Sequence, residues 1–235
     1  DCFIASPGFK LVSIDMSQLE FRLFAHYVQD EKLIEGFKNG VDYHVATAKF
    51  MFNKKEITDD ERSQGKTFNF GLIFGMGPAA LAKKLGVTLA VAEKLRNIYF
   101  KNIPKYPALQ LKIKEAISSR GYVKTFFGRR RYLPEDKSYV GLNAIIQGSA
   151  ADIFKWIIIN INNFLKEGGY KTRMINLIHD DILFEVHENE LHIIPLLAEV
   201  MRRNPGLRVP LDVDVKLGDS WGSLKKYKVE ELQNE

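Results

Sequence analysis

The chain has 235 residues, of which 46% are hydrophobic and 27% charged, and its formal net charge is +5. This composition excludes a disordered chain, and the length allows one large domain or two small ones. A single cysteine excludes a disulfide framework and a cysteine-based zinc site, and it predicts a reducing compartment. The longest uncharged stretch, 67–82, is short and broken by glycines, so we expect no membrane span.

The first predicted strand covers residues 10–16, and Asp15 lies near its end. Ser17 and Glu20 have the spacing of a capping box, in which each side chain bonds the other residue's backbone N–H. This spacing predicts a helix that continues to about Tyr27.

A second capping box, Thr58 to Glu61, predicts a helix that continues toward Phe74. Gly65 and Gly71 lie inside this helix, where each glycine costs roughly 1 kcal/mol relative to alanine. Glycine at these two positions indicates that something approaches the helix closely.

The remaining sequence is dominated by helical patterns, with the strands near the two ends of the chain. Helices are predicted over 88–100, 106–120, 142–166 and 188–203, a short hairpin or loop over 122–134, a hairpin over 174–186, and a last strand over 209–216. We therefore predict an α+β fold, in which a small antiparallel sheet of distant segments is flanked by helices and carries a large helical insertion.

Three carboxylates meet if the first strand and the second hairpin are neighbours in one sheet. Asp15 ends the strand, and Asp180 and Asp181 form the turn of the hairpin. Like charges this close repel, and a divalent cation such as Mg²⁺ removes that cost. Two such ions stabilise the attacking and leaving oxygens of a phosphoryl transfer. The alternative is that each acid is an ordinary turn or cap residue.

The helix after Thr58 carries two cations followed by two aromatic rings at four-residue intervals: Arg62, Lys66, Phe70 and Phe74. This spacing places them along one helix face. The strip could hold a triphosphate at one end and a base or sugar at the other, or it could be a helix with a solvated start and a buried end.

A basic and aromatic cluster surrounds Arg129 and Arg130, which suits phosphate contact and stacking, or a solvated turn. Asn143 and Gln147 lie four apart on one helix face, where they could donate to minor-groove acceptors or be solvated.

Three segments together resemble motifs A, B and C of the family A DNA polymerases, the bacterial DNA polymerase I group. They are DMSQLEFR at 15–22, RSQGKTFNFGLIFG at 62–75 and HDD at 179–181, in matching order and spacing. Further stretches agree at 128–134, 143–152 and 209–221, so the resemblance covers essentially the whole chain.

The resemblance implies a palm formed by 1–28 and 141–235 and a fingers region formed by 29–140. It implies template-directed transfer of nucleotides from dNTPs to a primer 3′-OH. The expected partners are primer-template DNA, dNTPs and an upstream polymerase segment that carries the thumb, with no membrane. The chain would be the C-terminal catalytic part of a longer polymerase or one piece of a split one. Its expected location is cytoplasmic, at a bacterial or phage nucleoid, with an organelle as the alternative.

The resemblance also implies roles for individual residues, according to the motif positions that they match. The resemblance implies two Mg²⁺ ions at Asp15 and Asp180, for which Mn²⁺ can substitute, and it implies that Lys66 is a catalytic proton donor. Asp181 takes the place of a second catalytic acid that is usually Glu. Nucleotide binding is expected at Gln18, Glu20, His44, Arg62, Lys66, Phe70 and Phe74, and DNA binding at Arg129, Arg130, Asn143, Gln147 and His179.

Four positions depart from the family pattern. Phe74 and Met16 each replace a usual Tyr, Asp181 replaces a usual Glu, and Tyr139 lies where bacterial members often carry an Arg. Two other function classes share part of the site. A non-catalytic DNA-binding remnant of a polymerase would not need intact carboxylates. A two-metal nuclease would not need the strip from Arg62 to Phe70.

Overall fold

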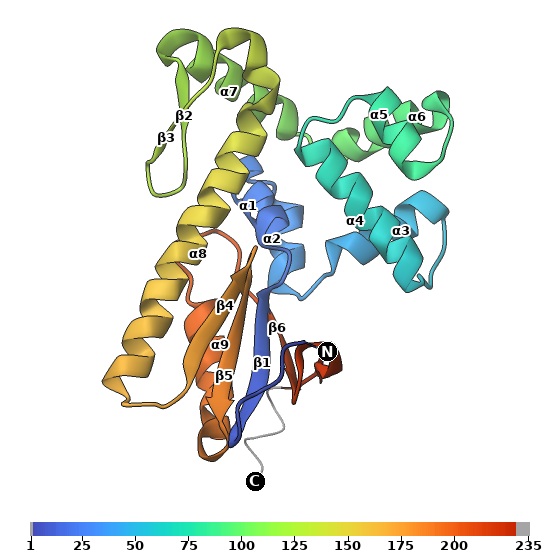
Figure 1. The fold of residues 1–235 in the computed structure, drawn as a ribbon. Helices are drawn as coiled ribbons and strands as arrows, with labels where there is room; N and C mark the ends of the chain where they lie inside the picture. The colour runs from blue at the N-terminus through green and yellow to red at the C-terminus, as the bar shows by residue number, and fades with distance from the viewer. Residues whose placement is uncertain (1, 229–235) are drawn as a thin grey trace. The chain divides into compact units, whose positions relative to one another are not determined.

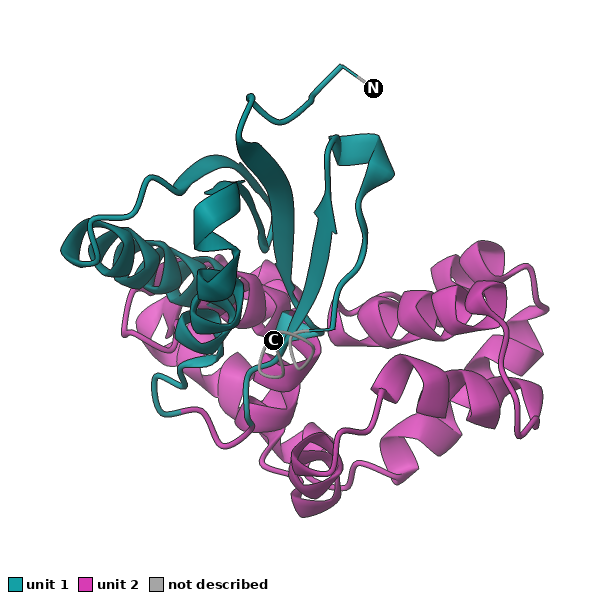
Figure 2. Ribbon diagram, turned by 90° about the horizontal axis from the view of Figure 1, so that it is seen from below, with its two compact units in different colours: residues 1–19, 150–206, 210–235 teal, residues 20–149, 207–209 magenta. Residues whose placement is uncertain are grey.

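The computed structural model describes residues 2–228, which form two compact units (Figures 1 and 2). The first unit comprises 1–19, 150–206 and 210–235, and the second comprises 20–149 and 207–209. Each unit therefore brings together segments that are distant in the sequence.

A five-stranded sheet forms the centre of the first unit. Its strand order is β4 (Arg173–Ile178), β5 (Asp181–His187), β1 (Phe9–Met16), β6 (Val213–Gly218) and β7 (Lys225–Lys226). Every neighbouring pair is antiparallel. The α+β fold with a small antiparallel sheet of distant segments is thus confirmed.

One face of this sheet is apolar. Val12, Ile14 and Met16 alternate along β1 and are buried, which is the pattern of a strand with one face on a core. Figure 2 shows α9 (Ile194–Arg202) and the later part of α8 (Gly141–Glu167) on one side of the sheet. Asp15 alternates with these residues along β1 and belongs to the other face.

Two predicted elements near the C-terminus begin later than expected. The last strand begins at Val213 rather than 209, because Pro210 has no N–H to donate to a ladder. The helix predicted over 188–203 divides into a 3₁₀ segment, η2 (Glu188–Ile193), and α9, which has a proline in its first turn. Proline is favoured there because the first turn needs no N–H donor.

Helices dominate the second unit. They are α1 (Leu19–Val28), α2 (Glu31–Lys38), α3 (Tyr43–Phe52), α4 (Asp59–Ile73), α5 (Pro78–Leu85), α6 (Leu89–Lys101) and α7 (Tyr106–Arg120), followed by a hairpin of β2 (Tyr122–Lys124) and β3 (Arg130–Tyr132), the 3₁₀ segment η1 (Glu135–Val140) and the start of α8. The predicted helices at 88–100, 106–120 and 142–166 and the hairpin at 122–134 are confirmed within one or two residues at their ends. The sequence patterns did not resolve α2, α3 and α5.

The two predicted capping boxes have different outcomes. At α4, Thr58 accepts from the Glu61 N–H and the Glu61 side chain accepts from the Thr58 N–H, so this capping box is confirmed. The first helix, however, begins at Leu19, and Gln18 before it has a φ of 54°. A regular capping box from Ser17 requires Gln18 to be helical, so the predicted capping box is wrong. The helix itself is found, and it begins one residue later than predicted.

Gly65 allows α3 and α4 to pack closely. A Cβ atom at Gly65 would lie 2.3 Å from the backbone oxygen of His44 and 3.0 Å from the Cβ of Ala48. At Gly71 the nearest side-chain atom, Leu81 Cδ1, would be 3.2 Å away. The close approach predicted from the two glycines is confirmed, and it is tightest against the backbone of α3.

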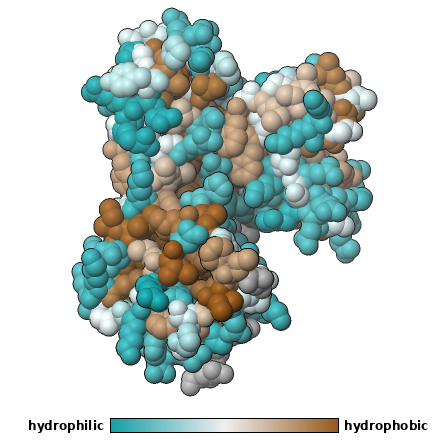
Figure 3. All heavy atoms as spheres, viewed as in Figure 1, coloured by the Kyte–Doolittle hydropathy of each residue, from teal (hydrophilic) through white to brown (hydrophobic). Residues whose placement is uncertain are grey.

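The helical stretch Glu135–Glu167 has the length and apolar composition of a membrane-crossing helix, but half of its most apolar window is buried, as in the core helix of a soluble protein. This is weak support for a span, and the absence of one stays a prediction. Figure 3 shows apolar surface gathered over α8 and β4, whose exposed large side chains are Ile159, Ile175 and Leu177.

We expect Gly65→Ala to destabilise the protein by roughly 2–3 kcal/mol, because the new methyl group meets backbone that cannot rotate away. The measurement is urea unfolding followed by circular dichroism. Gly77→Ala is the matched control, since nothing lies within 4 Å of its Cβ position. Equal effects of the two substitutions would contradict the packing argument.

Candidate active site

A row of carboxylates crosses three strands of the first unit. Asp15 of β1 pairs with Asp181 of β5 on one side and with Asp214 of β6 on the other. Directly paired residues present their side chains on the same face of a sheet. Asp180 lies in the turn before β5, where its backbone oxygen accepts from the Met16 N–H at 3.0 Å.

This row places the negative charges of several acids close to Asp15. Burial and then the charges of Asp180, Asp181 and Asp214 together raise the pKa of Asp15 to about 6, while the charge of Lys216 acts in the opposite direction. The structure therefore brings together the three acids that the sequence singled out. It adds Asp214 and Lys216, which the sequence analysis missed because only the register of β6 places them beside Asp15.

Asp181 is held by the central strand. The Ser13 hydroxyl lies 3.0 Å and 2.7 Å from the two carboxylate oxygens of Asp181, to which it donates. Burial raises the pKa of Asp181, while the Ser13 hydrogen bond and the Lys216 charge oppose that rise. The short Asp181 side chain is thus fixed against β1, two residues before Asp15.

The donor set suits a hard cation. Among residues 2–228 no group of three or more His, Cys, Asp or Glu side chains is arranged to hold a metal ion. Mg²⁺ is usually bound by one or two carboxylates, with water and substrate phosphates completing its shell. Asp15 and Asp180 fit that pattern. Burial and the Asp180 charge both raise the pKa of Asp15, so ionisation of Asp15 favours a bound cation.

The second unit carries a basic and aromatic strip on α4. Arg62 donates from Nε and Nη2 to Oδ2 of Asp42, at 2.8 Å and 2.7 Å. Asp42 also caps α3, since its Oδ1 accepts from the N–H groups of His44 and Val45. Burial alone would raise the pKa of Asp42, but the Arg62 and backbone hydrogen bonds hold it below its ordinary value.

The rest of the strip continues along the helix. Lys66 Nζ lies 5.7 Å from the Phe70 ring centroid, and the rings of Phe70 and Phe74 stack at 5.6 Å. The His44 ring lies 5.5 Å from Phe70. The structure therefore brings together Arg62, Lys66, Phe70, Phe74 and His44 within this unit.

His44 is a neutral imidazole at neutral pH. Burial lowers its pKa to about 4, and the charges of Arg62 and Lys66 act in the same direction, against the opposing effect of Asp42. A buried, neutral histidine beside two cations is well placed to donate a hydrogen bond to an anion.

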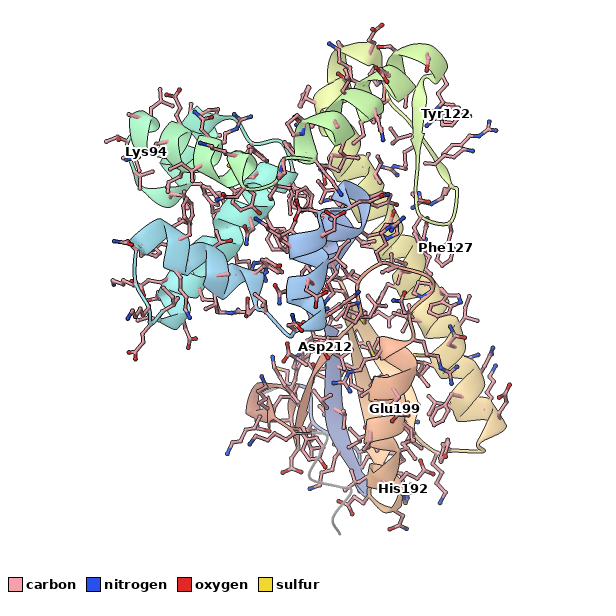
Figure 4. The ribbon with its side chains drawn as sticks, turned by 180° about the vertical axis from the view of Figure 1, so that it is seen from behind. Lys94, Tyr122, Phe127, His192, Glu199 and Asp212 are labelled. Carbon is pink, nitrogen blue, oxygen red and sulfur yellow. The ribbon has the colours of Figure 1, made fainter. Side chains whose placement is uncertain are left out.

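Four of the five predicted DNA-binding residues lie on two elements of the second unit. Arg129 donates to the Gly148 backbone oxygen of α8 at 3.0 Å, and Arg130 lies 4.9 Å from the Tyr122 ring. Phe127, at the turn of the hairpin, is half exposed (Figure 4). Asn143 and Gln147 lie in the first turns of α8, where Oδ1 of Asn143 is buried without a partner in the described chain.

The other three predicted residues adjoin turns. His179, in the turn before β5, has a φ of 57°. Gln18 and Glu20 flank the first residue of α1.

A family model described as DNA polymerase family A matches residues 1–223. The chain belongs to DNA polymerase family A. DNA polymerase I of Pseudomonas aeruginosa is 35% identical over 93% of this chain, and the thermostable DNA polymerase I of Thermus aquaticus is 37% identical over 95% of it.

A solved structure described as the POL domain of Pol1 from M. smegmatis, in complex with DNA primer-template and dNTP, has a TM-score of 0.86 and 35% identity. It covers 94% of this chain. The matches span 25% and 28% of the length of the two curated relatives and 41% of the solved chain. The resemblance seen in the three motifs is thus confirmed at the level of family and fold, and the residue roles stay predictions.

We expect Asp15→Asn to stabilise the metal-free protein at pH 7.5. The folded pKa of about 6 lies above the ordinary value of 3.8, so ionisation of Asp15 costs stability as pH rises through this range. The gain should disappear toward pH 4. Thermal unfolding in EDTA from pH 4 to 8 measures it, with the exposed Asp136→Asn as control. Added Mg²⁺ should stabilise the unmodified protein but not Asp15→Asn. A wild-type protein more stable than the variant in EDTA would contradict this.

Proposed function

We propose that this chain is the catalytic part of a template-directed DNA polymerase that transfers nucleotides from dNTPs to a primer 3′-OH. The observation that carries the proposal is the row of Asp15, Asp181 and Asp214, with Asp180 in the adjoining turn, in a chain of DNA polymerase family A. Primer-template DNA and dNTP, named for the solved relative, are the proposed partners.

In this proposal residues 1–28 and 141–235 are the palm and 29–140 the fingers. The two compact units support this division, although their boundaries fall after residues 19 and 149. The difference arises because α1 and the start of α8 pack with the helices of the second unit, as in the hydrogen bond between the Tyr27 and Ser149 hydroxyls.

The carboxylates of the first unit would serve metal binding. Asp15 and Asp180 would hold two Mg²⁺ ions, or Mn²⁺ in their place. Bound ions would lower the pKa of the primer 3′-OH and stabilise charge on the leaving oxygen. Asp15 carries the strongest demand for such an ion, because its ionisation is opposed by burial and by three neighbouring acids.

The strip on α4 would serve the nucleotide. Arg62 and Lys66 would neutralise the triphosphate, and Lys66 would donate a proton to the leaving pyrophosphate. Phe70 would pack against the nucleotide, with Gln18, Glu20 and Phe74 near the sugar. Primer-template contacts are proposed for Arg129, Arg130, Asn143, Gln147 and His179.

We further propose that this chain works with another polymerase segment. The chain spans 41% of the length of the solved polymerase chain and about a quarter of the length of the two curated relatives. The exposed apolar side chains of α8 and β4 in the first unit support a further packing partner, since such surface is costly in water.

Primer extension tests the proposed function. We expect Asp15→Ala to lower extension with Mg²⁺ and dNTPs by at least about two orders of magnitude, because the metal site loses a ligand. Asp136→Ala, at an exposed position, is the control. The assay is run with the chain alone and with the upstream polymerase segment supplied.

The other outcomes separate the alternatives. DNA binding without extension in either format indicates a non-catalytic remnant. Shortening of the primer without dNTPs, lost in Asp15→Ala, indicates a nuclease.

A second prediction concerns dideoxynucleotides. Phe70 has no hydroxyl to replace the missing sugar 3′-OH, so by family resemblance the protein should discriminate against them. We expect Phe70→Tyr to relax this discrimination by roughly tenfold or more, the value of one hydrogen bond to a charged or polar group. Competitive incorporation of ddNTP and dNTP measures the ratio, with the exposed Phe50→Tyr as control. Equal use of both nucleotides by the unmodified protein would refute the idea.

A further inference from the structure

A buried polar network joins α3 to α4 beside the basic strip. Asn69 is 0% exposed, His44 2% and Thr47 6%. Asn69 Nδ2 lies 3.2 Å from the Tyr43 backbone oxygen and 3.2 Å from His44 Nδ1, while its Oδ1 accepts from the Thr47 hydroxyl at 3.0 Å. Every polar group of the Asn69 side chain is therefore engaged.

The partners fix the orientation of the Asn69 amide. The Tyr43 backbone oxygen can only accept, so the amide nitrogen has to face it. The reversed amide would bring two carbonyl oxygens together in a buried site, which carries a desolvation penalty with no bond in return. The second N–H of the same nitrogen then points at Nδ1 of His44, and Nδ1 has to accept.

A neutral imidazole has one accepting and one donating nitrogen, and the hydrogen bond at one nitrogen sets the state of the other. We propose that Asn69 is a positioning residue that holds His44 as the tautomer with its proton on Nε2, so that Nε2 donates to a phosphate oxygen of the bound nucleotide. The identity of the anion rests on the proposed function, whereas the tautomer does not. The low pKa of His44 agrees, because it keeps the imidazole neutral.

The surroundings of His44 favour an anionic acceptor. Among residues 2–228 the buried side-chain atoms without a partner are Tyr99 Oη and Asn143 Oδ1, so Nε2 of His44 is not a buried orphan. Arg62 and Lys66 are close enough to lower the His44 pKa. A fixed N–H donor beside two cations is a phosphate-binding arrangement.

Gly65 makes this contact possible. It lies four residues before Asn69 on α4, and its missing Cβ lets the helix approach the His44 backbone oxygen. The same face of α4 therefore provides both the close approach at Gly65 and the Asn69 amide that contacts His44.

Nitrogen-15 NMR of histidine-labelled protein tests the tautomer directly. The His44 signals are assigned by their absence in His44→Gln. At pH 7.5 we expect the unmodified protein to show a protonated Nε2 and an unprotonated Nδ1. A protonated Nδ1 would overturn the proposal, whether or not the protein extends primers. Because this measurement needs no altered Asn69, the proposal stays falsifiable if a variant fails to fold.

Asn69→Asp supplies a second readout. Its carboxylate accepts rather than donates, so we expect the His44 proton to move to Nδ1, or both nitrogens to be protonated. Asn97→Asp, an exposed change of the same kind on α6, should leave His44 unchanged. A merely structural role for Asn69 would not move this proton, so an unchanged His44 spectrum in a folded Asn69→Asp protein would also overturn the proposal.

Binding of inorganic tripolyphosphate, measured by calorimetry without metal, tests the donor. We expect affinity to fall about tenfold or more in Asn69→Leu, which removes the amide without adding charge, and to be retained in Asn97→Leu. Unchanged binding in Asn69→Leu would overturn the assignment of Nε2 to a phosphate. Failure of primer extension alone, with these results intact, would instead count against the proposed function.

Discussion

The pairing of β1 with strands on both of its sides is the constraint on which the first unit depends. Because β1 is central, its register against β5 and β6 decides at once which side chains form the core and which meet on the other face. A shift of one residue would place Val12 and Ile14 where Ser13 and Asp15 now stand. The apolar core therefore holds the carboxylates together against their own repulsion.

The second unit depends on a different contact, the close packing of α3 and α4 at Gly65. Burying Asn69 and Thr47 there would be costly if their polar groups were unpaired. They are paired with each other and with the backbone of α3, so directional hydrogen bonds supplement the packing contact between the two helices. Asp42 links the same two helices nearer the surface, because its carboxylate both caps α3 and binds Arg62 of α4.

Much of the local structure could be predicted because its causes are short-range. The Thr58 capping box and the hairpin around Asp180 each depend on a few adjacent residues, and both are found. The start of α1 shows the limit of such patterns. Gln18 takes a positive φ at the junction of strand and helix, where the change of direction overrides the capping spacing of Ser17 and Glu20.

The sequence by itself determined most of the elements, the family motifs and the residues able to bind metal or phosphate. Side-chain chemistry and hydrophobic periodicity are properties of residues that are neighbours in the sequence. Only the tertiary structure decided that Asp214 and Lys216 join Asp15, that Ser13 holds Asp181, and that Asn69 meets His44. Strand register and helix packing set these contacts. Both depend on how distant apolar surfaces fit together, and no local pattern records that fit.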